Sequence, residues 1–183
     1  MALNDISICD FGWKAPDFML ADASGVSHSM ANHLGNKGLL IAFICNHCPY
    51  VKAIAQRFKT DTDELMAAGV GVLAIMSNDY QTYAEDAPKR MLEYAKVYGW
   101  QFPYLVDEDQ SVARGYDAKC TPDFFGLNKD GELQYRGRLD DVRMGSADNG
   151  RSRDLVDAMM QIAETGQGPR EQIPSMGCSI KWR

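Results

Sequence analysis

Apolar residues recur along the chain with two spacings, and these predict an alternation of strands and helices. A nearly continuous apolar run from Leu39 to Ile44 predicts a strand that is buried on both faces. Beyond Pro49, which a first helical turn tolerates because it needs no N–H donor there, apolar residues recur at helical spacing. These are Val51, Ile54, Ala55, Phe58 and Leu65. The chain therefore passes from a buried strand into a helix within residues 45–49.

The rest of the chain continues this alternation. We expect strands at residues 70–76 and 104–106, helices at 87–98, 111–116 and 153–165, and an antiparallel hairpin formed by residues 123–127 and 133–137. Near the N-terminus, the extended residues 15–18 and the turn at 22–25 predict a hairpin extension. This order implies an α/β fold with a mixed central sheet and helices on both faces.

The length of the chain bounds its organisation. With 183 residues, of which 45% are hydrophobic, the chain is long enough to bury one core without disulfide staples. Gly166 and Gly168 follow the last predicted helix and act as stop signals. We expect a single domain over residues 1–183, with a C-terminal tail from about residue 166.

Charge and hydropathy narrow the range of partners. The net charge of -6 leaves no basic stripe for nucleic acid or for an anionic membrane surface. No apolar run approaches the roughly 20 residues that span a bilayer. Residues 1–13 lack a basic segment followed by an apolar one, as a secretory leader would have. We therefore expect a cytoplasmic protein that binds neither nucleic acid nor membranes.

The cysteines carry the candidate chemistry. Five cysteines are an odd and sparse set for a disulfide scaffold, but two of them form the motif Cys45-Asn46-His47-Cys48 at the predicted strand-to-helix junction. A helix start stabilises a thiolate, so we expect Cys45 to attack and Cys48 to resolve. A charged His47 would stabilise the thiolate further. The spacing predicts a redox-active disulfide and no other cofactor.

A metal site is the alternative reading of the same pair. Two cysteines at this spacing are also half of a zinc site, and Cys120 and Cys178 would have to complete it. A metal-binding or carrier protein therefore stays open. The acidic residues Glu85 and Asp86 receive no role, because acidic clusters in loops are usually solvated.

Three segments together resemble a known family. They are Ala15-Pro16-Asp17-Phe18, Cys45 to Pro49, and Cys120-Thr121-Pro122-Asp123-Phe124-Phe125. With them the chain resembles the thioredoxin-like redoxins of the alkyl hydroperoxide reductase and thiol-specific antioxidant (AhpC/TSA) superfamily, from about Ala15 to Glu164. It is most similar to bacterial thioredoxin family or thiol-disulfide isomerase proteins with the motif at Cys45 to Val51 and a tail like Gly177 to Trp182.

The resemblance implies a thioredoxin-like fold and further site residues. Pro122 would be a cis-proline facing the dithiol, and Thr121 would present its backbone to an extended substrate. Asn46 and His47 would modulate the dithiol or face the substrate. Cys120 and Cys178 are candidate additional redox thiols. The alternatives are a buried small hydrophobe for Cys120 and a packing role for Cys178.

The leading hypothesis is a thiol-disulfide oxidoreductase that acts on protein or small-molecule thiols and disulfides, as a monomer or homodimer, with an external thiol reductant. The alternative is a peroxiredoxin-like peroxidase in which Cys48 attacks hydroperoxides. The chain departs from the peroxiredoxin signature Pro-x-x-x-Thr-x-x-Cys, because Cys45 occupies the Thr position. Three arginines are candidates for assisting peroxide chemistry: Arg136, Arg138 and Arg143.

Overall fold

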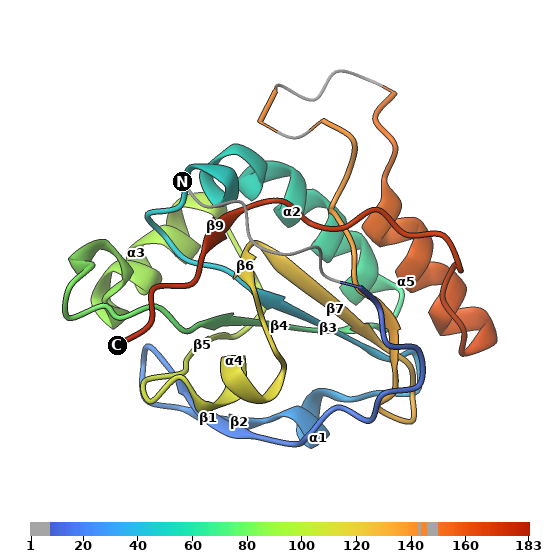
Figure 1. Cartoon of the computed structure of the whole chain (residues 1–183), viewed down its shortest axis with the longest axis horizontal. Helices are drawn as coiled ribbons and strands as arrows, with labels where there is room; N and C mark the ends of the chain where they lie inside the picture. Colours follow the sequence, from blue (N-terminus) through green and yellow to red (C-terminus); the bar gives the residue numbers. More distant parts are fainter. Residues whose placement is uncertain (1–7, 143, 146–149) are drawn as a thin grey trace.

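The computed structural model describes residues 8–142, 144–145 and 150–183, in which helices lie on both sides of a central sheet (Figure 1). The strands are β1 (Met19–Asp22), β2 (Ser27–Ser29), β3 (Leu39–Phe43), β4 (Gly71–Met76), β5 (Tyr104–Val106), β6 (Cys120–Thr121), β7 (Asp123–Leu127), β8 (Leu133–Tyr135) and β9 (Cys178–Ser179). The helices are α1 (Met30–His33), α2 (Pro49–Ala67), η1 (Ala84–Asp86), α3 (Pro88–Tyr98), α4 (Ser111–Gly115) and α5 (Asp154–Thr165). Arg143 and residues 1–7 of the segment inspected for a leader lie outside the described residues.

The main sheet has seven strands in the order β2-β1-β5-β4-β3-β7-β8. Strands β3, β4 and β5 run parallel, while β1 and β7 pair antiparallel at either side of them. The β1–β2 hairpin lies at one edge and the β7–β8 hairpin at the other. The expected α/β thioredoxin-like fold, with its mixed sheet and N-terminal hairpin, is confirmed.

Strand β3 separates two hydrophobic cores. Leu40, Ala42 and Ile44 enter the core that α2, α3 and α5 cover. The alternate residues of β3, Leu39 and Ile41 among them, enter the core that α1 and α4 cover. Because side chains alternate along a strand, a run with no polar position fills both cores. The prediction of a strand buried on both faces is confirmed.

The C-terminal tail forms a strand that the apolar pattern did not predict. After α5, the chain crosses the same side of the sheet as α2 and ends near α3 (Figure 1). On this path β9 pairs antiparallel with β6, with Thr121 opposite Cys178 and Cys120 opposite Ser179. The tail also shortens β8, which ends at Tyr135 and not at residue 137, because the next N–H, that of Arg136, donates to the Gln172 side chain.

The length and hydropathy of the helices were compared with what a bilayer requires. Among residues 8–142, 144–145 and 150–183, no helix is long and apolar enough to cross a bilayer.

Candidate active site

The dithiol lies where strand β3 gives way to helix α2, as the sequence predicts. Cys45 follows the strand, and Cys48 is the N-cap of α2; both are free thiols and almost fully buried. The Cys45 Sγ lies 3.3 Å from Thr121 Oγ1, and the Cys48 Sγ lies 3.1 Å from the Thr121 carbonyl oxygen. The Thr121–Pro122 peptide bond is cis. Four of the predicted site residues therefore meet at one point.

The two sulfurs differ in acidity. A hydrogen bond from the Cys45 thiol lowers the pKa of Cys48 to about 4, against the opposing effect of burial, and the Cys178 thiol and the Val51 amide assist. The same hydrogen bond, together with burial, raises the pKa of Cys45 well above its ordinary value. The helix start favours Cys48 because it caps the helix, whereas Cys45 lies three residues earlier. Of the two thiols, Cys48 therefore has the lower pKa, whereas the sequence predicts attack by Cys45; which sulfur attacks first stays a prediction.

A buried carboxylate organises the backbone between the cysteines. Asp86 has no solvent exposure, and its Oδ1 accepts the backbone N–H of Asn46 at 2.7 Å and of His47 at 3.1 Å. Its Oδ2 accepts Asn78 Nδ2 at 2.9 Å. Burial alone would raise the pKa of Asp86, but the hydrogen bonds from His47 and Asn78 outweigh it and lower the pKa. Nothing in the sequence assigns Asp86 a role, because an acidic residue in an expected loop carries no sign of burial.

His47 and Asn46 are fixed by different partners. His47 Nδ1 lies 2.5 Å from Asp86 Oδ2, and this hydrogen bond raises the pKa of the imidazole against the effect of burial. The ring also stacks on Tyr83, with centroids 5.1 Å apart. Asn46 is buried; its amide donates to the Glu85 carbonyl and accepts the Tyr104 hydroxyl. These contacts fit the modulating role better than direct contact with a substrate.

The two candidate additional thiols occupy different positions. Cys178 is half-buried beside the dithiol, and burial, followed by its hydrogen bond to Cys48, raises its pKa to about 11. Cys120 is buried, and its thiol donates to the Pro122 carbonyl at 3.4 Å. Burial raises the pKa of Cys120 above its ordinary value. Cys178 thus packs against the cluster that contains Cys48, whereas the Cys120 thiol is bonded to Pro122.

The arginines named for peroxide chemistry have other partners. Arg136 lies 3.0 Å from Asp123 and covers the ring of Phe125, and Arg138 lies 2.5 Å from Asp154. Arg143 falls outside the described residues. The role of these arginines in peroxide reduction stays a prediction.

One group of side chains has the composition of a metal site. Ligand atoms of Cys45, His47 and Asp86 lie within 4.8 Å of one another. However, His47 Nδ1 and Asp86 Oδ2 face each other at 2.5 Å, so a metal would have to break this pair to use both atoms. The geometry accommodates an ion pair that supports the dithiol more readily than a metal ligand set.

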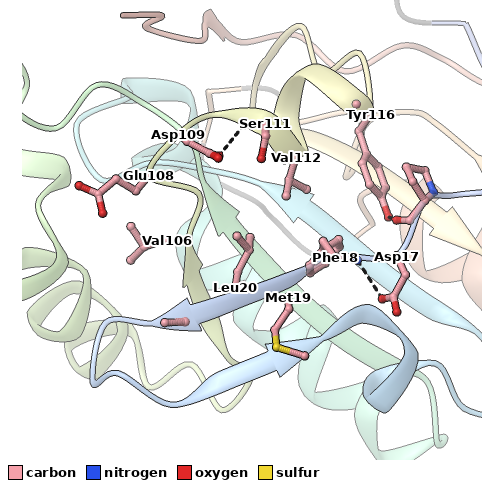
Figure 2. Close-up of a pocket in the computed structure, with 13 residues that line it drawn as sticks. Asp17, Phe18, Met19, Leu20, Val106, Glu108, Asp109, Ser111, Val112 and Tyr116 are labelled. Carbon is pink, nitrogen blue, oxygen red and sulfur yellow. Dashed lines mark hydrogen bonds between the residues drawn. The ribbon is translucent and has the colours of Figure 1, made fainter.

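Two hollows differ in their relation to the dithiol. A small cavity of about 90 Å³ lies beside Pro122 and Tyr50, under tail residues 173–176. A larger hollow of about 740 Å³ lies between β1, β5 and α4, on the other face of the sheet. Figure 2 shows Asp17 at one end of it and Glu108 and Asp109 at the other. Of these two, the smaller cavity adjoins the redox residues, because Pro122 lines it.

Comparison with known proteins relates the chain to thiol-based redox proteins. The sequence model of the AhpC/TSA family matches residues 11–136. Thiol-disulfide oxidoreductase ResA of Geobacillus kaustophilus is 28% identical over 131 residues, which cover 67% of this chain and 66% of ResA. Peroxiredoxin Bcp of Escherichia coli K12 is 27% identical over 117 residues, covering 64% of this chain and 70% of Bcp. The chain spans just under two thirds of the length of this ResA protein.

Two solved structures match nearly the whole chain. A conserved protein from Geobacillus kaustophilus is 38% identical, with a TM-score of 0.92 and coverage of 100% of this chain and 97% of that chain. A protein from Sinorhizobium meliloti 1021 is also 38% identical, with a TM-score of 0.88 and coverage of 99% and 97%.

Proposed function

Because the chain belongs to the AhpC/TSA family, a family of thiol-based redox proteins, we propose that it is a thiol-disulfide oxidoreductase whose Cys48 attacks and whose Cys45 resolves. The observation that carries this proposal is the position of Cys48 at the N-terminus of α2, with Cys45 and Cys48 both in contact with Thr121; the lowered pKa of Cys48 agrees with it. A thiolate is the nucleophile in disulfide exchange, and here it has a second thiol in contact.

The reaction follows from these contacts. The Cys48 thiolate attacks one sulfur of a substrate disulfide, so a mixed disulfide forms and the other substrate sulfur leaves as a thiolate. That thiolate takes up a proton, and Cys45 gives up its own proton and attacks the Cys48 sulfur. The substrate is released with two thiols, and Cys45 and Cys48 form a disulfide. An external dithiol, or two monothiols, restores the reduced enzyme.

The surroundings of the dithiol bear on the class of substrate. The backbone of Thr121 is where an extended peptide would pair, but β9 already pairs there. Small disulfides need no such pairing, whereas a peptide would first have to displace the tail. Small-molecule disulfides are therefore the substrates that this geometry favours.

A matched pair of variants tests the order of attack. Both variants carry Cys178→Ser, because Cys178 contacts Cys48. With oxidised glutathione, Cys45→Ser should accumulate one glutathione on Cys48, and Cys48→Ser should accumulate at least tenfold less, as measured by intact mass spectrometry. A glutathione adduct on the Cys48→Ser variant alone would show that Cys45 is the attacking thiol. Adduct on neither variant would contradict disulfide exchange.

The peroxidase alternative makes a different prediction. If Cys48 reduces hydroperoxides, loss of hydroperoxide with dithiothreitol as reductant should vanish in Cys48→Ser and persist in part in Cys45→Ser. We expect both variants to lose hydroperoxide only at the background rate of the reaction with dithiothreitol alone. Cys120→Ser is the matched control, because its thiol donates to Pro122 and not to the dithiol.

A further inference from the structure

The C-terminal tail is fastened on both sides of Cys178. Before it, the Ser175 hydroxyl donates to the Pro122 carbonyl at 2.7 Å. After it, Ile180 is buried in the core, and the backbone N–H of Lys181 donates to the Asn78 side chain at 2.8 Å. The Lys181 carbonyl accepts the N–H of Asp79, also at 2.8 Å. The tail therefore holds Cys178 in one place.

That place is the edge on which a substrate peptide would pair. Strand β9 is antiparallel to β6 and sets Cys178 opposite Thr121, the residue before the cis-proline. The Thr121 carbonyl oxygen is 3.1 Å from the Cys48 Sγ. Strand addition at such an edge is how extended peptides bind. The tail thus presents a cysteine where a bound peptide would present its own.

The Cys178 thiol also lies beside the dithiol. Cys178 is opposite Thr121 in the β6–β9 pairing, and the Thr121 carbonyl oxygen is 3.1 Å from the Cys48 Sγ, so Cys48 has both the Cys45 and the Cys178 thiol near it. Cys178 also packs against the core cluster that contains Cys45 and Cys48. Cys48 consequently has two partners within the chain for a disulfide.

We propose that Cys178 is a third redox thiol and a second resolving partner for Cys48. This inference rests on the proposed function of the dithiol. Starting from the Cys45–Cys48 disulfide, the Cys178 thiol loses its proton and its sulfur bonds to the Cys48 sulfur. The Cys45–Cys48 bond breaks, and Cys45 takes up the proton as a free thiol. No external oxidant is needed, because one disulfide replaces another.

The exchange changes the site in two ways. Cys45 becomes a free thiol, and the tail becomes covalently attached at the edge of β6. A mixed disulfide on Cys48 would be resolved by Cys178 in the same manner, with the substrate leaving as a thiol. In either case the product is a disulfide between Cys48 and Cys178.

The experiment restores Cys178 to the trapping variant. Cys45→Ser and Cys45→Ser/Cys178→Ser are incubated with oxidised glutathione, quenched in acid, alkylated and mapped by mass spectrometry. With Cys178 present, glutathione on Cys48 should fall at least tenfold, and a peptide pair linked through Cys48 and Cys178 should replace it. Equal glutathione adduct in both variants, with no linked pair, would overturn the inference.

A displaced thiol serves as the matched control. Moving the cysteine one position, as Cys178→Ser/Ser179→Cys in the Cys45→Ser background, turns the thiol to the other face of β9 and should leave the adduct in place. An intramolecular link to residue 179 at the same yield would show a loose tail and contradict the inference. If no variant forms an adduct or a linked pair on Cys48, both the proposed function and this inference are wrong. If an adduct forms on Cys48 and Cys178 does not resolve it, only the redox role of Cys178 is contradicted.

Discussion

At the scale of single residues, the site depends on a carboxylate outside the cysteine motif. Asp86 is fully buried, which a charge tolerates only with partners, and it has the backbone N–H groups of Asn46 and His47, the His47 ring and the Asn78 amide. These contacts fix the two residues between the cysteines. We expect the geometry of the dithiol to depend on this one side chain.

Asp86→Asn should lower the pKa of His47 and destabilise the fold. In the wild type, the hydrogen bond to Asp86 raises the pKa of His47 above its unfolded value of about 6.5. The resulting stabilisation is complete below that value and is lost as pH rises through the raised pKa. The variant should lose about 2 kcal/mol near pH 6 and less above the raised pKa. Urea unfolding at several pH values and NMR titration of the ring measure both effects.

The neighbouring residue supplies the control for this prediction. Glu85 is exposed, and its ion pair with Lys52 is long, at 3.5 Å. Glu85→Gln should change the free energy of unfolding by less than about 0.5 kcal/mol and leave the His47 titration as it is. An unchanged His47 pKa in Asp86→Asn would contradict the role given to the carboxylate.

The difference between the cysteines and Asp86 shows what the sequence can reveal about a site. Cys45 and Cys48 are recognisable because their spacing lies within one stretch of chain, and Pro122 because a family pattern marks it. Asp86 lies far along the chain in an acidic loop without periodicity, so nothing distinguishes it from a solvated residue. The difference in pKa between the two sulfurs could not be predicted either, because it depends on the hydrogen bond between the two thiols and on their burial, which arise only in the folded chain.

At the scale of elements, long periodic segments were predictable and short paired ones were not. Helices α2, α3 and α5 and strands β3 and β4 appear where their spacing places them, with ends that differ by a residue or two. Strand β9 has two residues and forms by pairing with β6, so no local sequence pattern predicts it. Tertiary contact, and not propensity, makes it a strand.

Gly177→Ala should loosen β9 from β6. A Cβ at this position would lie 2.1 Å from the Thr121 carbonyl oxygen, closer than side chains approach backbone, so the tail must move. We expect a loss of about 1–3 kcal/mol in the free energy of unfolding. Because β9 pairs with Thr121, which contacts the Cys48 sulfur, alkylation of Cys48 should become at least several-fold faster, as followed by mass spectrometry.

Gly115→Ala is the control for this element. A Cβ there meets no atom within 4 Å, and its φ is not in the left-handed region. It should leave the alkylation rate of Cys48 unchanged. Equal rates in Gly177→Ala and the wild type would show that β9 does not limit access to the sulfur.

At the scale of the whole molecule, an ion-pair network joins the segment after β8 to helix α2. Asp61 has no exposure and lies 2.5 Å from Arg151 and 2.7 Å from Arg153. Arg151 also lies 3.0 Å from Asp140, which Arg57 of α2 contacts at 2.7 Å. The network connects residues that are about 90 positions apart, and neither strand order nor these long-range pairs could be read from local spacing.

Asp61→Ala should be strongly destabilising. Removal of the carboxylate takes the shared partner from the half-buried side chains of Arg151 and Arg153, which keep their contacts to Asp140 and Glu64, and should cost about 2–3 kcal/mol. Asp63→Ala removes a half-exposed ion pair with Lys59 on the same helix and should cost less than about 0.5 kcal/mol. Urea unfolding compares the two, and similar losses would contradict the structural role of Asp61.

Because β9 pairs with β6, a peptide that binds at this edge beside the dithiol has to compete with the tail. A tethered segment competes with free ligands at an effective concentration on the order of millimolar. A peptide that offers only the same backbone pairing would have to be present at a similar concentration to compete. Under the proposed function, small thiols and disulfides would meet no such competition, and we expect the paired tail to select among substrates by their concentration.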